Sequence, residues 1–146
     1  MESSQNEPVC IRLLIVDDQP RVRQSLEALL TALGWRTPGH AGMAIQIVGE
    51  ADDGDQAVER VDALRPDVVV LDLPMHGTAQ RTASGPEPDG LAAIRTIKHR
   101  WPAIKIVVFT MYATDRAAVL LAGADIFLLK GCPTSELLAA VTPTFR

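Results

Sequence analysis

The segment PDVVVLDL (66–73) contains a run of four apolar residues, Val68–Leu71, followed at once by Asp72. A short run rich in Val and Leu that does not alternate with polar residues is typical of a strand buried on both faces of a sheet. Such strands belong mostly to parallel sheets that are covered by helices on both sides. The segment therefore predicts one strand of a parallel sheet, with the Asp72 carboxylate just beyond its carboxyl end.

Four further apolar runs of the same kind lie on either side of this segment, at 13–16, 45–48, 104–109 and 126–129. Stretches with helical spacing separate them. The first three stretches predict a helix through Leu33 with Gly34 as its stop, a helix that ends before Pro66 and a helix through Ile94. The fourth predicts a helix at about 114–122, with helical spacing at Ala118, Leu121 and Ala122. The last predicts a helix that starts from Thr134 as N-cap and has Glu136 in its first turn. Because strand and helix alternate five times, the predicted fold class is α/β, a doubly wound five-stranded parallel sheet with helices on both faces.

The length of 146 residues favours one domain. We expect a flexible N-terminal segment at 1–10, a folded domain at 11–142 and a short C-terminal tail at 143–146. Residues 78–88, TAQRTASGPEP, predict a mobile insertion loop because they are small, polar and Pro-containing. This loop has two open interpretations, a tolerated surface insertion or a lid that selects partners beside the site.

Composition narrows the class of function. The net charge of −4 argues against direct nucleic-acid binding by this chain, which needs a basic surface. The sequence has no run of about 18 apolar residues, so we expect no membrane-spanning helix, and residues 1–8 lack the features of a signal peptide. A cytoplasmic location follows, and Cys10 and Cys132 are expected to be free thiols.

Five polar side chains follow the predicted strands, and all of them would gather at the carboxyl-end edge of one parallel sheet. They are Asp17, Asp18, Asp72, Thr110 and Lys130. Close carboxylates raise one another's pKa unless a cation balances them, and Mg²⁺ prefers such hard oxygen ligands. An aspartate can attack phosphorus, while an ammonium and a hydroxyl stabilise a transferring phosphoryl group. Each residue alone is more often a helix cap or a solvated charge, so their shared edge is what favours a site.

The sequence resembles the response-regulator receiver family of two-component signalling over nearly its whole length, outside the termini and the two long connections at 34–44 and 78–88. The matching stretches are LLIVDDQP (13–20), GEADDGDQAVE (49–59), PDVVVLDLPMHG (66–77), DGLAAIRTIK (89–98), IKIVVFTMYA (104–113) and AGADIFLLKG (122–131). The GEADDG and LLK segments are most similar to the subgroup whose members usually carry a C-terminal helix-turn-helix DNA-binding domain. The resemblance implies a flavodoxin-like fold with strand order 2-1-3-4-5.

The resemblance also implies a role for each site residue. Asp72 is expected to be the phospho-acceptor, and Lys130 is expected to pair with both the phosphoryl group and Asp72. Asp18 is expected to ligate Mg²⁺ directly and Asp17 largely through water. The backbone carbonyl of Pro74 is the remaining implied metal ligand.

The switch implied by the resemblance couples Thr110, which bonds a phosphoryl oxygen, to the rotamer of Phe127. The face made by the fourth helix, fifth strand and fifth helix is the expected switching surface, through which a homodimer can form. The implied phosphodonor is a phosphohistidine on a sensor histidine kinase or a histidine phosphotransfer protein. The chain would then be no enzyme with an external substrate, because it would catalyse only its own phosphorylation and dephosphorylation.

The loop after Asp72 departs from the family pattern, since Pro74 precedes Met75-His76 where members usually show a Met-Pro pair. Pro74 keeps its carbonyl but stiffens the loop, so the lifetime of the phosphoryl group stays open. His76 is open to two interpretations, a solvated loop residue or a metal or catalytic group.

Three alternative functions remain. A pseudo-receiver would bind partners without control by phosphate. A hydrolase or flavin carrier on a similar fold is less favoured, because the second Asp of strand-end phosphatases is replaced here by Pro74. No basic helix-turn-helix follows before Arg146, so the chain is expected to be either a stand-alone receiver or the receiver part of a DNA-binding transcriptional regulator.

Overall fold

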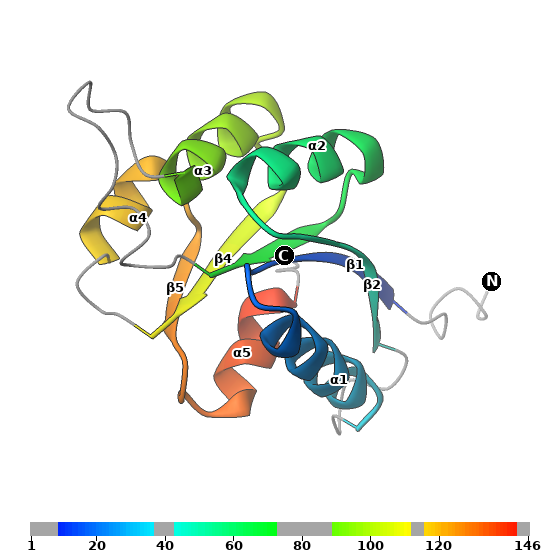
Figure 1. The fold of residues 1–146 in the computed structure, drawn as a ribbon. Helices are drawn as coiled ribbons and strands as arrows, with labels where there is room; N and C mark the ends of the chain where they lie inside the picture. Colours follow the sequence, from blue (N-terminus) through cyan, green and yellow to red (C-terminus); the bar gives the residue numbers. More distant parts are fainter. Residues whose placement is uncertain (1–8, 37–42, 73–88, 112–115, 143–146) are drawn as a thin grey trace.

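The computed structural model describes residues 9–36, 43–72, 89–111 and 116–142, in which strands and helices alternate (Figure 1). The strands are β1 (Val9–Val16), β2 (Met43–Ala51), β3 (Val68–Leu71), β4 (Lys105–Thr110) and β5 (Ile126–Leu129). The helices are α1 (Pro20–Arg36), α2 (Gly54–Leu64), α3 (Asp89–Arg100), α4 (Arg116–Ala122) and α5 (Thr134–Val141). Each predicted strand and helix is present in the described part of the chain.

The strands form one parallel sheet in the order β2-β1-β3-β4-β5, which confirms the predicted fold class and topology. Helices α1 and α5 cover one face of this sheet, and α2, α3 and α4 cover the other (Figure 1). The strand order reverses between β1 and β3. In a doubly wound sheet, the carboxyl ends of the strands at this reversal form the usual ligand crevice.

Strand β3 lies in the middle of the core, since all four of its residues are buried. Val69 and Leu71 belong to the apolar cluster on the side of α2, α3 and α4, whereas Val68 and Val70 belong to the cluster on the side of α1 and α5. This alternation follows from the two-residue period of a strand. The unbroken apolar run in the sequence therefore reflects a layer of helices against each face.

The first two strands are longer than their apolar runs. Strand β1 begins at Val9, within the segment assigned above to the flexible N-terminus, and β2 covers Met43–Ala51. The first residues of β1 pair with β2 before β3 joins the other side of β1 at Leu13. Backbone pairing with one neighbour extends a strand without a fully buried side-chain run, so the apolar runs understate both lengths.

Two helix ends differ from the predictions. Helix α1 continues through Gly34 to Arg36, so the prediction of Gly34 as its stop is wrong. A glycine inside a helix costs only about 1 kcal/mol and is tolerated where the neighbouring turns support it. Helix α5 has Pro133 as its N-cap instead of Thr134, and no side chain caps it, whereas Glu136 does lie in its first turn.

Helix α4 faces the core with a side that the sequence does not mark. Val119 and Ala122 are buried, while Ala118 is exposed and Leu121 is 80% exposed. Of the three residues whose spacing indicated this helix, only Ala122 is buried. Residues 117–122 are all apolar, so no polar stripe marks the outer face of this helix.

Both cysteines are free thiols, as predicted. Cys10 is exposed near the start of β1, whereas Cys132 lies half-buried beyond the carboxyl end of β5. Across the described ranges, no helix combines the length and the apolar character needed to cross a membrane.

Candidate functional site

Four of the predicted site residues lie at the carboxyl-end edge of the sheet. Asp17 follows β1, Asp72 follows β3, Thr110 ends β4 and Lys130 follows β5. Their backbone amides continue the hydrogen bonding of the sheet, since Asp72 N donates to Val16 O at 2.9 Å and Lys130 N donates to Thr110 O at 2.7 Å. The sheet therefore fixes where each side chain starts and brings together residues that are far apart in the sequence.

Lys130 joins two acidic side chains. Its Nζ lies 3.2 Å from Asp72 Oδ2 and 3.5 Å from Asp17 Oδ2. The Asp17 side chain is only 3% exposed, and those of Asp72 and Lys130 are each 20% exposed. Partly buried charges are screened less than surface charges, so these contacts carry more energy than exposed pairs. One ammonium group thus faces two carboxylates, and all three side chains are largely shielded from solvent.

Gly131 allows the chain to turn directly after Lys130. Its φ of 101° lies in the left-handed region that favours glycine. Apart from Gly131 and its two chain neighbours, no heavy atom of the described residues lies within 4 Å of the point where a Cβ would be placed. The backbone conformation, and not a lack of space, therefore requires glycine here. The turn leads the chain away from β5 toward α5 while the Lys130 side chain stays at the site.

The surroundings of Asp72 disfavour a negative charge on its side chain. Burial raises the pKa of the Asp72 carboxyl above its ordinary value of 3.8, and the negative charge of Asp17 acts in the same direction. Lys130 lowers this pKa but does not cancel the increase. The folded protein therefore disfavours the charged form of Asp72, and a bound cation would relieve this.

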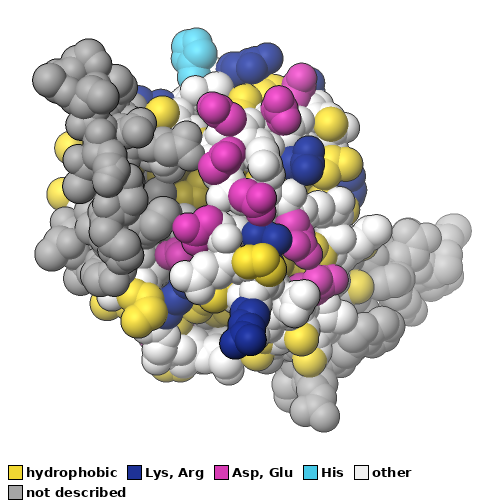
Figure 2. Space-filling view, in the orientation of Figure 1, with side chains coloured by type: hydrophobic (Ala, Val, Ile, Leu, Met, Phe, Trp, Pro, Cys, Tyr) yellow, Lys and Arg dark blue, Asp and Glu magenta, His cyan; other side chains and the backbone are white. Residues whose placement is uncertain are grey.

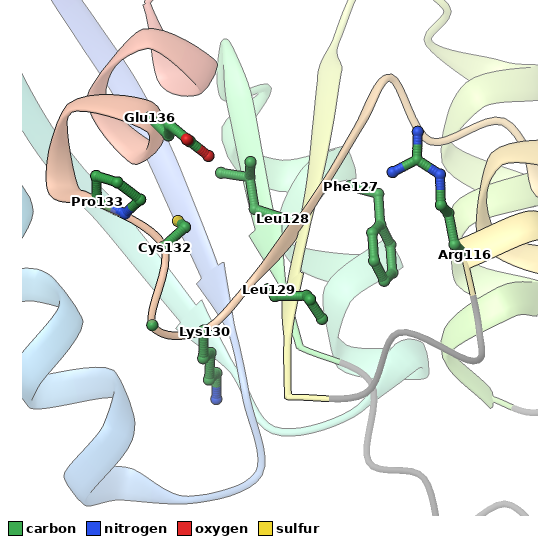
Figure 3. Close-up of a pocket in the computed structure, with 9 residues that line it drawn as sticks. Arg116, Phe127, Leu128, Leu129, Lys130, Cys132, Pro133 and Glu136 are labelled. Carbon is green, nitrogen blue, oxygen red and sulfur yellow. The ribbon is translucent and has the colours of Figure 1, made fainter.

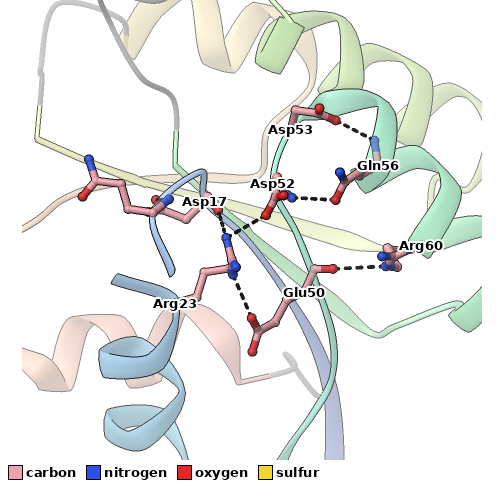
Figure 4. Close-up of polar contacts among 8 residues, drawn as sticks. Asp17, Arg23, Glu50, Asp52, Asp53, Gln56 and Arg60 are labelled. Carbon is pink, nitrogen blue, oxygen red and sulfur yellow. Dashed lines mark hydrogen bonds and ion pairs between the residues drawn. The ribbon is translucent and has the colours of Figure 1, made fainter. Parts of the chain in front are cut away.

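Asp17 is also held by neighbours that the sequence analysis did not identify (Figure 4). Its Oδ1 accepts a hydrogen bond from Gln19 N at 2.9 Å, and its carbonyl oxygen accepts one from Arg23 Nη1 at 2.7 Å. The Arg23 guanidinium also donates to Glu50 Oε1 and Asp52 Oδ1, each at 2.8 Å. Glu50 and Asp52 both lie within the GEADDG segment (49–54), and this acidic segment is the sequence feature that could have indicated a basic partner.

The described residues assemble only part of the predicted metal ligand set. Asp18 is exposed. Within the described ranges, no group of three or more His, Cys, Asp or Glu side chains is arranged to hold a metal ion. Pro74, His76 and the loop at 78–88 lie outside the described residues, so their roles stay predictions.

The rim of the site is acidic. Asp18, Asp52 and Asp53 are exposed beyond the ends of β1 and β2. In Figure 2 acidic side chains gather near the middle of the face, where these strands lead into α1 and α2, with basic side chains among them. A negative rim raises the local concentration of cations.

The two predicted switch residues lie on neighbouring strands. Thr110 is fully buried, and Phe127 is partly buried against the core cluster on the α2, α3 and α4 side. The Arg116 guanidinium lies over the Phe127 ring, 5.9 Å from its centroid. Arg116 and Phe127 line an open groove of about 540 Å³ along β5 and the start of α5 (Figure 3).

The chain is similar in sequence and in fold to known proteins. The chain is 31% identical over 137 residues to the response regulator GacA of Pseudomonas viridiflava, covering 92% of this chain and 55% of GacA. It is 33% identical over 133 residues to the transcriptional regulatory protein LiaR of Bacillus subtilis, covering 90% of this chain and 54% of LiaR. The signal receiver domain of the putative response regulator NarL from Mycobacterium tuberculosis superposes with a TM-score of 0.71 at 27% identity, covering 92% of this chain and 94% of that domain.

The chain spans about half the length of the curated relatives it matches. Residues 13–142 match the family described as response regulator receiver domain. That match covers almost all of the described sheet and helices, including every strand end at the site. The chain therefore belongs to the receiver-domain family of two-component response regulators.

Proposed function

We propose that the chain is a signalling switch in which Asp72 accepts a phosphoryl group from a phosphohistidine. The donor is a sensor histidine kinase or a histidine phosphotransfer protein. One observation carries this proposal, the placement of Lys130 Nζ between the carboxylates of Asp72 and Asp17, at 3.2 and 3.5 Å. A lysine so placed can neutralise charge on a phosphoryl group that arrives at Asp72.

The transfer itself needs one nucleophile and stabilisation of charge. An Asp72 carboxylate oxygen attacks phosphorus, the bond between phosphorus and the donor imidazole nitrogen breaks, and the imidazole leaves with the bonding electron pair. Lys130 then lies beside the new aspartyl phosphate. The chain catalyses only this reaction and the later hydrolysis of its own phosphoryl group.

The site also suits Mg²⁺. Two carboxylates share one ammonium, the rim is acidic, and the donor atoms are the hard oxygens that this ion prefers. We propose that Asp17, Asp18, Asp72 and the backbone carbonyl of Pro74 hold the ion. When bound, Mg²⁺ supplies positive charge to the phosphoryl oxygens.

We propose that the signal leaves the site through Thr110 and Phe127. The Thr110 hydroxyl would bond a phosphoryl oxygen, and the Phe127 ring would respond by changing its rotamer. The proposed output surface is the face of α4, β5 and α5, through which a homodimer can form. Exposed apolar side chains on it, Leu120, Leu121 and Leu129, support this assignment because such side chains are favoured at protein contacts.

The output of the whole protein is a separate proposal. LiaR is named a transcriptional regulatory protein, and this chain matches about half of it. We propose that the chain acts as the receiver part of a regulator whose other half binds DNA. The acidic net charge of −4 leaves DNA contact to such a second part.

A small phosphodonor tests the central proposal. Incubation with acetyl phosphate and Mg²⁺ should add one phosphoryl group to the wild-type chain, detected as a mass increase of the intact protein. Asp72→Asn should remain unmodified, whereas Asp67→Asn, an exposed aspartate at the other end of β3, should be modified normally. Modification that persists in Asp72→Asn would contradict the acceptor assignment. A wild-type chain that takes up no phosphoryl group would favour the pseudo-receiver.

A further inference from the structure

We propose that Arg23 is a positioning residue that holds the Asp17–Asp18 segment in the geometry that binds a divalent cation. This inference rests on the proposed function, because it concerns the same site. It also assigns a role to Glu50 and Asp52, which phosphotransfer chemistry leaves unused.

Arg23 acts on the peptide group that joins Asp17 to Asp18. Its Nη1 donates to the Asp17 carbonyl oxygen at 2.7 Å. That oxygen lies in the same planar group as the backbone nitrogen of Asp18, so fixing its direction fixes the plane of the whole group. The Asp17 side chain meanwhile accepts from Gln19 N at 2.9 Å. The segment is thus held both by its own turn and by Arg23.

Arg23 is itself firmly placed. Its backbone nitrogen donates to Gln19 O at 3.1 Å, and its side chain is only 14% exposed. The guanidinium pairs with Glu50 and Asp52, each at 2.8 Å. The hydrogen bond to Glu50 raises the pKa of Arg23 further, so the side chain stays cationic. Because a guanidinium presents several donors in one rigid plane, it can join these oxygens at once.

The contacts of Arg23 link the segment between β1 and α1 to the segment between β2 and α2 (Figure 4). Arg23 lies in the first turns of α1, while Glu50 and Asp52 lie at the end of β2 and just beyond it. Asp17 N donates to Ala51 O at 3.0 Å, which ties the same two segments through the backbone. Arg23 therefore completes a ring of contacts around the residue that faces Lys130.

Whether removal of Arg23 weakens or strengthens metal binding distinguishes a positioning role from a purely electrostatic one. Arg23 is a cation beside a proposed cation site, so its removal should strengthen metal binding if charge alone mattered. If Arg23 orients the ligands, its removal frees the Asp17–Asp18 peptide to rotate, and metal binding weakens. Removal of residues that orient metal ligands weakens affinity by about tenfold or more.

A calorimetric titration with MgCl₂, without any phosphodonor, measures this effect. We expect Arg23→Ala and Arg23→Met to raise the Kd for Mg²⁺ by about tenfold. Arg60→Ala is the matched control, because Arg60 also donates to the backbone at the end of β2, to Glu50 O at 3.1 Å, but is exposed and bonds to neither Asp17 nor Asp18. It removes the same charge and should leave the Kd unchanged or lower.

A second readout needs no metal. The amide resonances of Asp17 and Asp18 in a ¹H–¹⁵N spectrum should shift in Arg23→Met but not in Arg60→Ala. Arg23→Met keeps the aliphatic stem of the side chain, so it serves if Arg23→Ala does not fold. An unchanged or lower Kd in the folded Arg23 variants, with Mg²⁺ binding intact in the wild type, would overturn this inference alone. A wild type that binds no Mg²⁺ would overturn the proposed metal site and the role of Arg23 with it.

Discussion

Lys130 Nζ lies 3.2 Å from Asp72 Oδ2, although β4 separates the two strands that these residues follow. The lysine therefore extends past the carboxyl end of β4, where Thr110 is buried, and its ammonium lies 6.0 Å from the centroid of the Phe109 ring. A change of charge at Asp72 would act directly on Lys130, the residue that follows β5. This relationship links the proposed chemistry at β3 to the strands that carry the proposed switch.

Replacement of Lys130 by Met should slow phosphorylation of Asp72 by roughly a hundredfold, the usual effect of removing one group that stabilises developing charge. The rate of mass increase with acetyl phosphate at saturating Mg²⁺ measures this effect. Arg65→Met is the control, because Arg65 lies after α2, away from the carboxyl-end edge of the sheet, and its side chain is 58% exposed. Equal rates for the two variants would contradict the role of Lys130.

The orientation of α4 leads to a prediction about stability. Val119 is fully buried whereas Leu121 is 80% exposed. Val119→Ala should lower the free energy of unfolding by about 1–3 kcal/mol because it leaves a cavity, while Leu121→Ala should change it by less than about 0.5 kcal/mol. Urea denaturation of both variants checks the difference. A larger loss for Leu121→Ala would mean that the helix is rotated relative to the structure.

The sequence predicts β3 and β5 to the residue, because each has a short apolar run bounded by residues that end a strand. It also predicts the gathering of Asp17, Asp72 and Lys130, since topology alone brings the carboxyl ends of parallel strands together. It does not predict the face of α4, where every residue of 117–122 is apolar.

The contacts of Arg23 could not be predicted from the sequence either. They depend on the direction in which the Arg23 side chain leaves α1 and on the position of the end of β2 relative to it. Apolar periodicity reports neither quantity, because it records which faces are buried and not which polar atoms meet. Glu50 and Asp52 are visible in the GEADDG segment, but the sequence does not show which basic side chain contacts them.

Lys98 joins several segments at the amino-end edge of the sheet, and its loss should destabilise the fold. Its Nζ donates to Pro102 O at 3.1 Å, Ile104 O at 2.9 Å and Asp125 Oδ2 at 3.0 Å, and its side chain is 20% exposed. Lys98→Met should lower the free energy of unfolding by about 1–2 kcal/mol, a range that allows for solvent screening.

The exposed pair of Arg65 and Asp62 provides the contrast for Lys98. Both of these side chains are more than half exposed. Asp62→Ala should therefore change the free energy of unfolding by less than about 0.5 kcal/mol. Urea denaturation compares the two variants, and a loss for Lys98→Met no larger than that for Asp62→Ala would show that the three contacts of Lys98 contribute little.

Lys105 should make the stability of the fold depend on pH in the alkaline range. It starts β4, and its Nζ donates to Thr142 O at 3.0 Å. Burial lowers the pKa of Lys105 below its ordinary value of 10.5, and the charge of Asp125 offsets only part of this decrease. Between the lowered pKa and 10.5, the unfolded chain binds more protons than the folded chain. The free energy of unfolding should therefore increase with pH across that window.

Lys105→Gln removes the titrating group but keeps a hydrogen-bond donor. Below the lowered pKa both states of the wild type are protonated at Lys105, so this residue adds no pH dependence there. Denaturant unfolding of the two proteins at several alkaline pH values gives the difference between their free energies of unfolding. That difference should shift in favour of the wild type as the pH rises toward 10.5. A difference that stays constant across this range would show that burial does not perturb the lysine in the folded protein.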